Sequence, residues 1–431
     1  MRPVLAFGFA FPILLLIVMT IFGLRGYERA LKDTEELSKR RAVENNKFAA
    51  QLAAERVAAE IERYFEIASH EAHRDSFTEH FNAVRQHPLL SQLASVPMES
   101  AKLARLQEEF TGDSKRQDMN SYLERRLRRY RRHPKLASMF VLNAEGTMLA
   151  AAYEGEESLP SVAKNFAYRS YFHGGPTDLP SDTRSPAVKP VQETHLSAVF
   201  QSTITNKWKV AVATPLWRDV PDSEQEQVAG LLVVTLNLGD FEFFKAIQSE
   251  EKDRLAVLID GRPGDHTGAI LQHPLFDQAI LAGQPLPESF LHMRVALQKD
   301  GTLPSNEYTD PLGNDPLGKA YQRSWLAAAA PVRSVNADDD TSGGQKTAGL
   351  VVLVQEDYLA VISPVRQLGQ RLVREGLLAL AVVLLVTILL WIVVLRILRT
   401  QRMSPRLVAT TPRTALPSHS DTTLAMPLRE E

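Results

Sequence analysis

The sequence predicts an α+β protein in which a long N-terminal helix precedes two tandem antiparallel-sheet lobes, and two transmembrane helices flank this region. Three observations carry the prediction. Two uncharged apolar runs lie toward the two ends of the chain, an apolar stripe at helical spacing follows the first run, and four strand pairs occur in a repeating order.

Composition excludes several classes of protein. The chain has 431 residues, of which 44% are hydrophobic and 23% are charged, as in ordinary globular domains. Its 49 basic and 51 acidic residues nearly balance, so the charge does not indicate a nucleic-acid partner. The absence of cysteine excludes disulfides, a thiol nucleophile and cysteine-ligated metal centres.

Residues 3–23 and 376–395 contain no charged residue, and each run matches the roughly 20 residues that cross a membrane as a helix. The first run exceeds the apolar core of a signal peptide and lacks a small-residue cleavage site, so we expect an uncleaved anchor. Five arginines follow the second run before any acidic residue, which predicts a cytoplasmic C-terminus. Two spans then place the N-terminus in the cytoplasm and residues 24–375 outside it, although Arg25, Arg29 and Lys32 oppose this orientation.

Residues 24–135 are predicted to be a helical stalk containing one long helix. Its apolar stripe consists of residues at i, i+4, i+7, i+8 and i+11: Val57, Ile61, Tyr64, Phe65 and Ala68. The basic run at residues 125–135 and the segment His70–His73 are both interpreted as solvated helix faces. The tail, residues 396–431, is rich in Pro, Ser, Thr and Arg and is expected to be disordered in the cytoplasm.

Strand pairs are predicted within residues 138–152, 208–238, 255–274 and 324–355. The order repeats: three landmark pairs, Val141 with Val257, Pro215 with Pro331 and Gly230 with Gly349, are offset by 116, 116 and 119 residues. This near-constant spacing predicts an internal duplication. The expected lobes are residues 136–250, distal to the membrane, and residues 251–365, proximal to it.

These features resemble double Cache sensor ectodomains, which contain tandem PAS-like lobes. The resemblance covers roughly residues 27–365 and is carried by five segments: FVLNAEGTMLA at 140–150, NFAYRSYFHGG at 165–175, HLSAVFQSTITNKWKVAVATPLW at 195–217, VAGLLVVTLNL at 228–238 and VLIDGRPGDHTGAILQHP at 257–274. The chain is most similar to the ectodomains of planctomycete-type membrane Ser/Thr kinases, here without a kinase. A resemblance of fold implies sensing by analogy.

The resemblance also implies a pocket in the distal lobe. In amino-acid-binding members, an Arg and an aromatic residue hold the ligand carboxylate, and Arg169 and Tyr171, followed by Phe172, match them. Phe200-Gln201-Ser202 and Thr235 stand where the family has the acidic residues that hold the amine. An ammonium group would therefore lack a counter-charge. The expected ligand is a neutral or carboxylate-bearing small molecule, held by Arg169, Tyr171, His173, Ser202 and Thr235.

No catalytic, cofactor or metal site is predicted. Residues 313–320 approach a phosphate-binding loop, but Ala320 replaces the metal-binding hydroxyl and Pro316 removes a backbone donor, so the segment is interpreted as two turns. His70 and His73 have no third ligand, and no Ser-His-Asp spacing is present.

The predicted function is that of a two-pass sensor in the cell membrane. It would bind a small ligand outside the cytoplasm, form a homodimer along the long helix, and signal through its transmembrane helices to a cytoplasmic kinase or regulator. Two alternatives stay open. Arg169 pairs within its own loop and the pocket is vestigial, or the chain is a non-catalytic envelope interaction or structural protein.

Overall fold

The computed structural model describes residues 2–95, 101–131, 135–155, 161–184, 187–202, 207–219, 226–247, 253–264, 266–281, 287–333 and 347–402. The chain divides into two compact units. One consists of Met1–Glu28 with Gln367–Glu431, and the other is Arg29–Arg366. Both sheets and the candidate site belong to the second unit.

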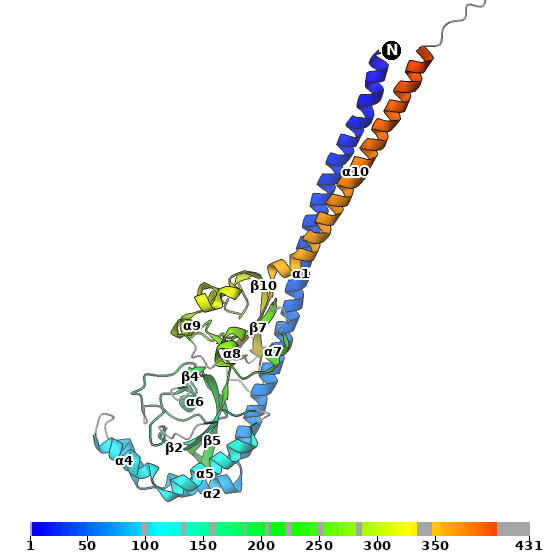
Figure 1. Ribbon diagram of the computed structural model, residues 1–431. Helices are drawn as coiled ribbons and strands as arrows, with labels where there is room; N and C mark the ends of the chain where they lie inside the picture. The colour runs from blue at the N-terminus through cyan, green and yellow to red at the C-terminus, as the bar shows by residue number, and fades with distance from the viewer. Residues whose placement is uncertain are drawn as a thin grey trace, which may run out of the picture. The chain divides into compact units, whose positions relative to one another are not determined.

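The predicted long helix is α1, which spans Arg2–Ala72. Its predicted stripe is confirmed, because the side chains from Val57 to Ala68 that form it are at most 6% exposed. Four shorter helices follow: α2 (Asp75–Arg85), α3 (Leu89–Ser95), α4 (Ala101–Thr111) and α5 (Ser114–Arg129). In Figure 1, α2, α4 and α5 lie at the end of the first sheet that faces away from the second sheet.

The first lobe, defined here by β1–β6, contains an antiparallel sheet with the order β2-β1-β6-β5-β3, and β4 also pairs with β5. Its elements are β1 (Ser138–Asn143), β2 (Met148–Tyr153), α6 (Ser170–His173), β3 (His195–Leu196), β4 (Phe200–Gln201), β5 (Trp208–Asp219), β6 (Glu226–Asn237) and, after the sheet, α7 (Phe243–Ile247). The long β5–β6 pair and the β1–β2 hairpin confirm the first two predicted strand pairs.

The second lobe, β7–β11, repeats this topology with the order β8-β7-β11-β10-β9. Its elements are β7 (Arg254–Asp260), β8 (Ile270–Gln272), α8 (Pro274–Leu281), α9 (Glu288–His292), β9 (Glu307–Thr309), the 3-10 turns η1 (Pro311–Asn314) and η2 (Pro316–Tyr321), β10 (Ser324–Arg333) and β11 (Thr347–Asp357). The other two predicted strand pairs are therefore confirmed. The predicted boundary between the lobes, at residues 250 and 251, lies outside the described residues.

The register of the two sheets corrects the predicted spacing of the repeat. In the first sheet, Phe140, Val233 and Ala213 are paired side by side on β1, β6 and β5. Their counterparts on β7, β11 and β10 of the second sheet are Val257, Leu353 and Ala329, in the same order. The offsets are therefore 117, 120 and 116 residues, so two of the three predicted spacings are wrong by one. A shift of one residue reverses the face of a strand. Accordingly, Val141 and Val257, paired by sequence, pack into different cores.

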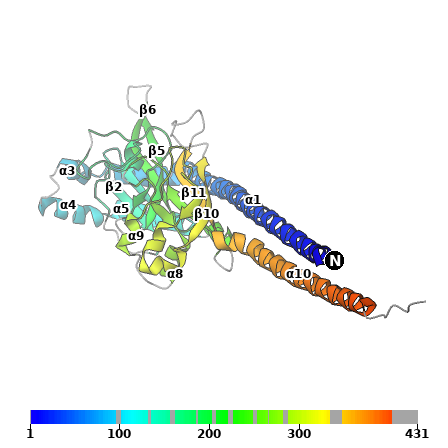
Figure 2. The ribbon, with the colours of Figure 1, turned by 90° about the horizontal axis from the view of Figure 1, so that it is seen from above.

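Both faces of each sheet are buried. One face of each packs against a shared apolar cluster that includes residues of α1, α2 and α5. On the opposite faces each lobe has a cluster of its own. Figure 2 shows the strands of both sheets beside α1. The site described below lies on the face of the first sheet that is turned away from the α1 cluster.

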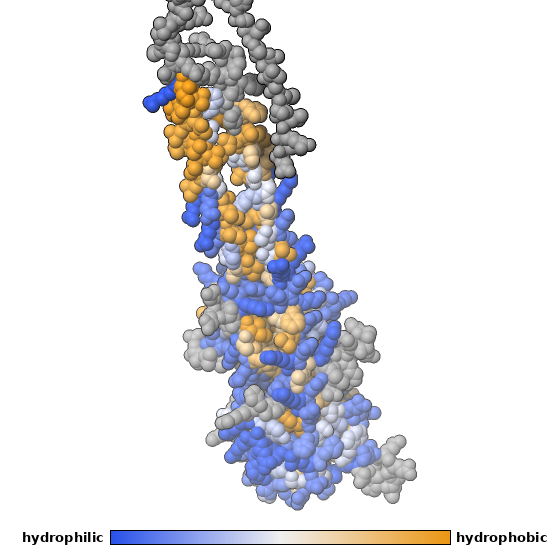
Figure 3. All heavy atoms as spheres, turned by 90° about the vertical axis from the view of Figure 1, so that its right-hand side faces the viewer, coloured by the Kyte–Doolittle hydropathy of each residue, from blue (hydrophilic) through white to orange (hydrophobic). Residues whose placement is uncertain are grey.

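Helix α10 runs over Tyr358–Arg402 and follows β11 directly. Among the described residues, one helix is long and apolar enough to cross a membrane, over Tyr358–Ile397, and it contains the predicted span 376–395. In Figure 3 apolar side chains gather on the long helices, whereas the surface of the lobes is mostly polar. The first predicted span, 3–23, is helical, but most of its early side chains lie outside the described residues, so it stays a prediction.

The predicted tail begins later than expected. Residues 396–402 continue α10, because the apolar and basic residues there maintain the helix, and residues 403–431 lie outside the described part of the chain.

Candidate functional site

A cavity opens on the face of the first sheet opposite to α1. Its volume is about 40 Å³, and about 410 Å³ when all the space between the lining atoms and the open solvent at the mouth is counted. Its lining comes from four strands of the sheet (β1, β2, β5 and β6), the segment around α6 and the β4 region: Ser138, Phe140, Met148, Tyr153, Ser161, Phe166, Arg169, Tyr171, Phe200, Ser202, Lys209 and Thr235. Apolar walls with a few polar groups are typical of small-molecule sites.

Five of the seven predicted site residues line this cavity: Arg169, Tyr171, Phe200, Ser202 and Thr235. The structure does not bring Phe172 and His173 to it. Phe172 is fully buried in the apolar cluster of the lobe. His173 donates from Nε2 to the Tyr168 carbonyl at 3.1 Å and accepts from the Gly175 amide at 3.0 Å. Tyr171, Phe172 and His173 are consecutive residues of the single turn α6, so their side chains point in different directions and cannot all face one cavity.

Arg169 is held by its own loop as well as by the cavity wall. Its Nη1 donates to Asp178 at 2.7 Å, and the other oxygen of Asp178 accepts from the Ser170 amide at 2.8 Å. The guanidinium carbon lies 5.2 Å from the ring centre of Phe200. Burial alone would lower the pKa of Arg169, but Tyr171 and Asp178 beside it raise that pKa, so the cation is retained. The loop pairing that the sequence left as an alternative therefore exists.

Tyr171 presents a neutral phenol to the cavity. Its ring contacts Phe140 and Phe200 edge-on, with ring centres 5.6 and 5.7 Å apart. Complete burial raises its pKa well above the ordinary value. Among the described residues no group accepts a hydrogen bond from its hydroxyl. The phenol is thus a donor available to a ligand.

The polar floor of the cavity lies on the central strands. Ser138 of β1 and Thr235 of β6 face each other in register, and their hydroxyl oxygens are 2.6 Å apart. Lys209 of β5 is 3% exposed and stands opposite Phe200 of β4. Our sequence reasoning missed Lys209. The signal was present, because Lys209 shares the alternating face of β5 with the buried Ala211 and Ala213, where a lysine is out of place.

The charge of the lining is one-sided. Arg169 and Lys209 are its charged residues, and neither Asp nor Glu is among the described lining residues. Arg169 is paired with Asp178, which is not among the lining residues, so part of this positive charge is already compensated.

The equivalent place in the second lobe is filled by protein. The register places Trp325 where the first lobe has Lys209, Gln355 where it has Thr235, and Leu255 where it has Ser138. All three are fully buried. The Trp325 indole donates to the Tyr321 carbonyl at 3.1 Å, and the Gln355 amide donates to Asp310 at 2.8 Å. The candidate site therefore belongs to the first lobe.

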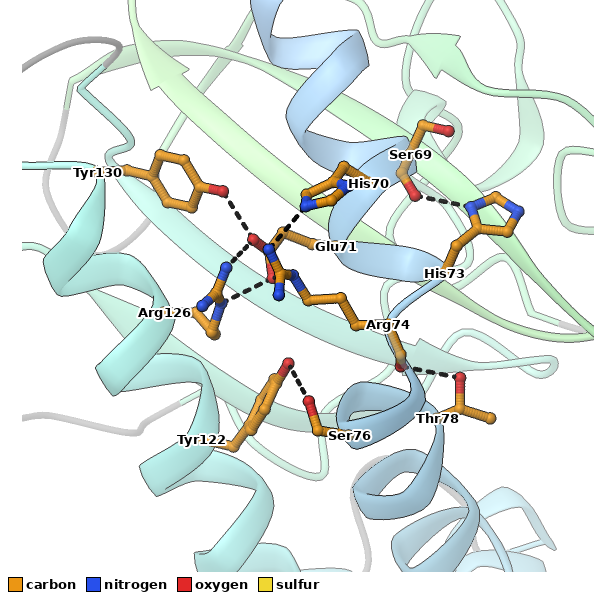
Figure 4. Close-up of polar contacts among 10 residues, drawn as sticks. All are labelled: Ser69, His70, Glu71, His73, Arg74, Ser76, Thr78, Tyr122, Arg126 and Tyr130. Carbon is orange, nitrogen blue, oxygen red and sulfur yellow. Dashed lines mark hydrogen bonds and ion pairs between the residues drawn. The ribbon is translucent and has the colours of Figure 1, made fainter.

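Two interpretations of charged segments need correction at the end of α1. Glu71 lies between His70 and His73 but is only 1% exposed, and it accepts hydrogen bonds from Arg126 and Tyr130 (Figure 4). The segment His70–His73 and the basic run are thus solvated only in part, because helical geometry turns one charged residue of each, Glu71 and Arg126, inward. Among the described residues no group of three or more His, Asp or Glu is placed to hold a metal ion.

The segment that approaches a phosphate-binding loop forms two 3-10 turns, as predicted. Asp310 caps η1 by accepting from the Leu312 amide, and Asp315 caps η2 in the same way through Leu317.

No family model and no curated protein matches the chain. Among solved structures, it is similar to the ligand-binding domain of the amino acid chemoreceptor PctC of Pseudomonas aeruginosa in complex with GABA, with 15% identity, coverage of 73% of this chain and 100% of that one, and a TM-score of 0.34. The ligand-binding domain of the chemoreceptor CtaA of Pseudomonas fluorescens with L-leucine has 12% identity, coverages of 76% and 97%, and a TM-score of 0.35.

The sensor domain of the V. cholerae histidine kinase DctB has 14% identity, coverages of 68% and 98%, and a TM-score of 0.30. These structures are sensor domains, the class that the sequence resembles. The resemblance to Ser/Thr kinase ectodomains stays a prediction.

Proposed function

We propose that this chain is a membrane-anchored extracytoplasmic sensor that binds a small organic anion in the cavity of its first lobe. Transmission would run through two transmembrane helices to a cytoplasmic kinase or regulator. The observation that supports the proposal is the lining of the cavity, in which Arg169 and Lys209 are the charged residues among those described, with Arg169 also paired to Asp178 at 2.7 Å.

The donors around the cavity suit a carboxylate. Arg169 hydrogen-bonds to Asp178 through one terminal nitrogen, and a guanidinium has five donors in a planar fork. Tyr171 adds a phenolic donor, and Lys209 of β5 lines the same cavity. The guanidinium donors of Arg169 that Asp178 does not use and the Tyr171 phenol can therefore donate to a ligand carboxylate, whereas an ammonium ligand would approach the positive charge of Arg169.

A thermal-shift series on the full chain in detergent micelles tests this assignment. Acetate, lactate, succinate and citrate are compared with ethanolamine and glycinamide at matched ionic strength. A ligand at 100 times its Kd stabilises by about 2.7 kcal/mol, which raises Tm by several degrees. Lys209→Met and Arg169→Gln should each abolish the rise. Lys207→Met, an exposed position two residues from Lys209, should retain it. Stabilisation by the amines alone would contradict the proposal.

A homodimer along α1 is supported by an exposed apolar face. Leu37, Phe48 and Leu52 lie on one side of the helix and are 50%, 69% and 44% exposed. We expect Phe48→Glu to shift the full chain toward monomer in sedimentation equilibrium. Lys47→Glu, at the exposed neighbouring position, should leave the association unchanged. Equal behaviour of both variants would argue against this interface.

The alternative, a non-catalytic envelope protein with a vestigial pocket, is favoured by one observation. Arg169 already has a counter-ion in Asp178, at 2.7 Å. If the ion pair with Asp178 is the only role of Arg169, no anion raises Tm. Arg169→Gln and Asp178→Asn then destabilise the chain to the same extent without changing any ligand response.

A further inference from the structure

The wall of the cavity reaches the second lobe through Arg262. This residue follows β7, and its Nη1 donates to the Ser197 carbonyl of the first lobe at 2.6 Å. Its side chain is 12% exposed, so the contact is largely shielded from water. A second contact lies next to it, where the rings of Trp208 and His266 meet edge-on with centres 5.3 Å apart.

On the first-lobe side, Ser197 belongs to the segment that ends in the cavity residues Phe200 and Ser202. The Ser197 hydroxyl accepts from the Ala211 amide of β5 at 2.8 Å. The next amide, of Ala198, donates to the Ser170 hydroxyl at 2.8 Å, and Ser170 directly follows Arg169. These bonds link the neighbours of Arg169 and Phe200 to the Ser197 carbonyl that accepts from Arg262.

On the second-lobe side, Arg262 is fixed to the sheet. Its Nε donates to Asp260 at 3.2 Å, and its side chain lies flat on Gly349, where an added Cβ would be 2.1 Å from its Cγ. The Gly261 amide also donates to the Gly349 carbonyl at 2.9 Å. Arg262 thus packs against the N-terminal part of β11.

Strand β11 leads directly into α10. Asp357 is its last residue, and its carboxylate accepts from the Leu359 amide at 2.7 Å, which caps the first turn of the helix. Arg323 donates to the other oxygen of Asp357. No linker separates strand and helix, so a displacement of β11 along its length is a displacement of the start of α10.

We propose that Arg262 is the residue that couples the first-lobe cavity to β11 and, through β11, to α10. The ligand that would act through this coupling rests on the proposed function, whereas the contacts that make the coupling do not depend on it. Arg262 is the hydrogen-bonding side chain of this junction, and the Trp208–His266 contact and the shared apolar cluster lie beside it. Coupling between two sites typically amounts to about 5- to 150-fold.

The test is a double-mutant cycle read by amide hydrogen exchange on the full chain in micelles, with no ligand present. Phe200→Ala perturbs the cavity wall. We expect it to speed exchange in the Leu350–Val354 stretch of β11 and at Leu359 by about fivefold or more. In an Arg262→Ala background the same substitution should change these rates less than about twofold. Arg294→Ala is the matched control, because this arginine bonds its own loop at the Met293 carbonyl, and the response should persist.

A response of β11 that survives Arg262→Ala, or no response to Phe200→Ala in the parent, would overturn the coupling. If either alanine variant fails to fold, Thr235→Val serves as the cavity perturbation and Arg262→Lys as the broken link, with the same two criteria. Succinate separates the two proposals. If Arg262→Ala removes the response of β11 to Phe200→Ala but succinate leaves Tm unchanged, the coupling is supported and the anion ligand is refuted. If succinate raises Tm, also in Arg262→Ala, but β11 does not respond to Phe200→Ala, the anion ligand is supported and the coupling is refuted.

Discussion

Arg126 and Glu71 form a buried ion pair that joins the end of α1 to α5. The Arg126 Nε donates to one carboxylate oxygen at 2.8 Å, its Nη2 donates to the other, and the Tyr130 hydroxyl adds a third bond at 2.6 Å. The two side chains are 9% and 1% exposed. Since α5 also packs on β2 and β1, this pair fixes the first lobe to the long helix.

Removal of one partner should be costly. Arg126→Ala leaves the Glu71 carboxylate in the protein interior with only Arg74 and Tyr130 beside it, and loss of one member of a buried pair costs about 3–5 kcal/mol. Arg128→Ala removes the exposed pair with Glu124 on the same helix and should cost under about 1 kcal/mol. Urea denaturation followed by circular dichroism measures both. Equal losses would show that the buried pair contributes nothing particular.

Acid should destabilise the second lobe through Asp310. Burial alone would raise the pKa of this carboxyl, but His273, Gln355 and the Leu312 amide hold its pKa below the ordinary value. A carboxyl whose pKa is lower in the folded state stabilises the protein above its unfolded pKa, about 3.9, and this contribution is lost as pH falls through the folded pKa. We expect Tm to be level from pH 7 to about 5 and to fall below about pH 4.

Two variants make the acid prediction specific. Asp310→Asn should lower Tm at pH 7 and reduce its dependence on pH below about 4, whereas the exposed Asp182→Asn should do neither. Part of the dependence should remain in Asp310→Asn. Burial would raise the pKa of Glu71, but Arg126 and Tyr130 lower it overall, so this carboxyl acts in the same pH range. An unchanged profile in Asp310→Asn would contradict the assignment.

Trp325 should be a packing residue of the second lobe. It is fully buried where the first lobe has its cavity, so Trp325→Ala should cost about 3–5 kcal/mol in urea denaturation. Trp217→Ala provides the comparison, because this tryptophan of β5 is 42% exposed and its removal leaves no closed cavity. A loss of under about 1 kcal/mol in the free energy of unfolding of Trp325→Ala would mean that Trp325 does not fill the second lobe and that the two lobes do not differ in this way.

The orientation in the membrane can be tested with single cysteines, because the chain has none of its own. In intact spheroplasts, a membrane-impermeant maleimide should label Ala320→Cys, an exposed position of the second lobe. Ser404→Cys should be labelled only after permeabilisation, and the parent chain is the blank. The opposite pattern would place the lobes in the cytoplasm and end the proposal of an extracytoplasmic sensor.

Periodic features could be predicted from the sequence because they depend on local geometry. The stripe from Val57 to Ala68 indicated α1, and the alternation around Asn143 and Gly146 indicated the first hairpin. Arg169 and Tyr171 were found through a motif and do line the cavity. Lys209 was missed because its meaning depends on which face of β5 points to the cavity, and His173 was included because a motif does not show where a helical turn points.

Local pattern and residue chemistry alone determined that this chain has a long helix, a repeated set of antiparallel strands, apolar runs of membrane length and no cysteine. Only the tertiary structure decided which copy of the repeat is open. The two sheets have the same strand order, but Lys209 and Thr235 leave space in the first, whereas Trp325 and Gln355 fill it in the second. The difference depends on side-chain volume summed across neighbouring strands, and the register that brings those strands together is set by packing between residues far apart in the chain.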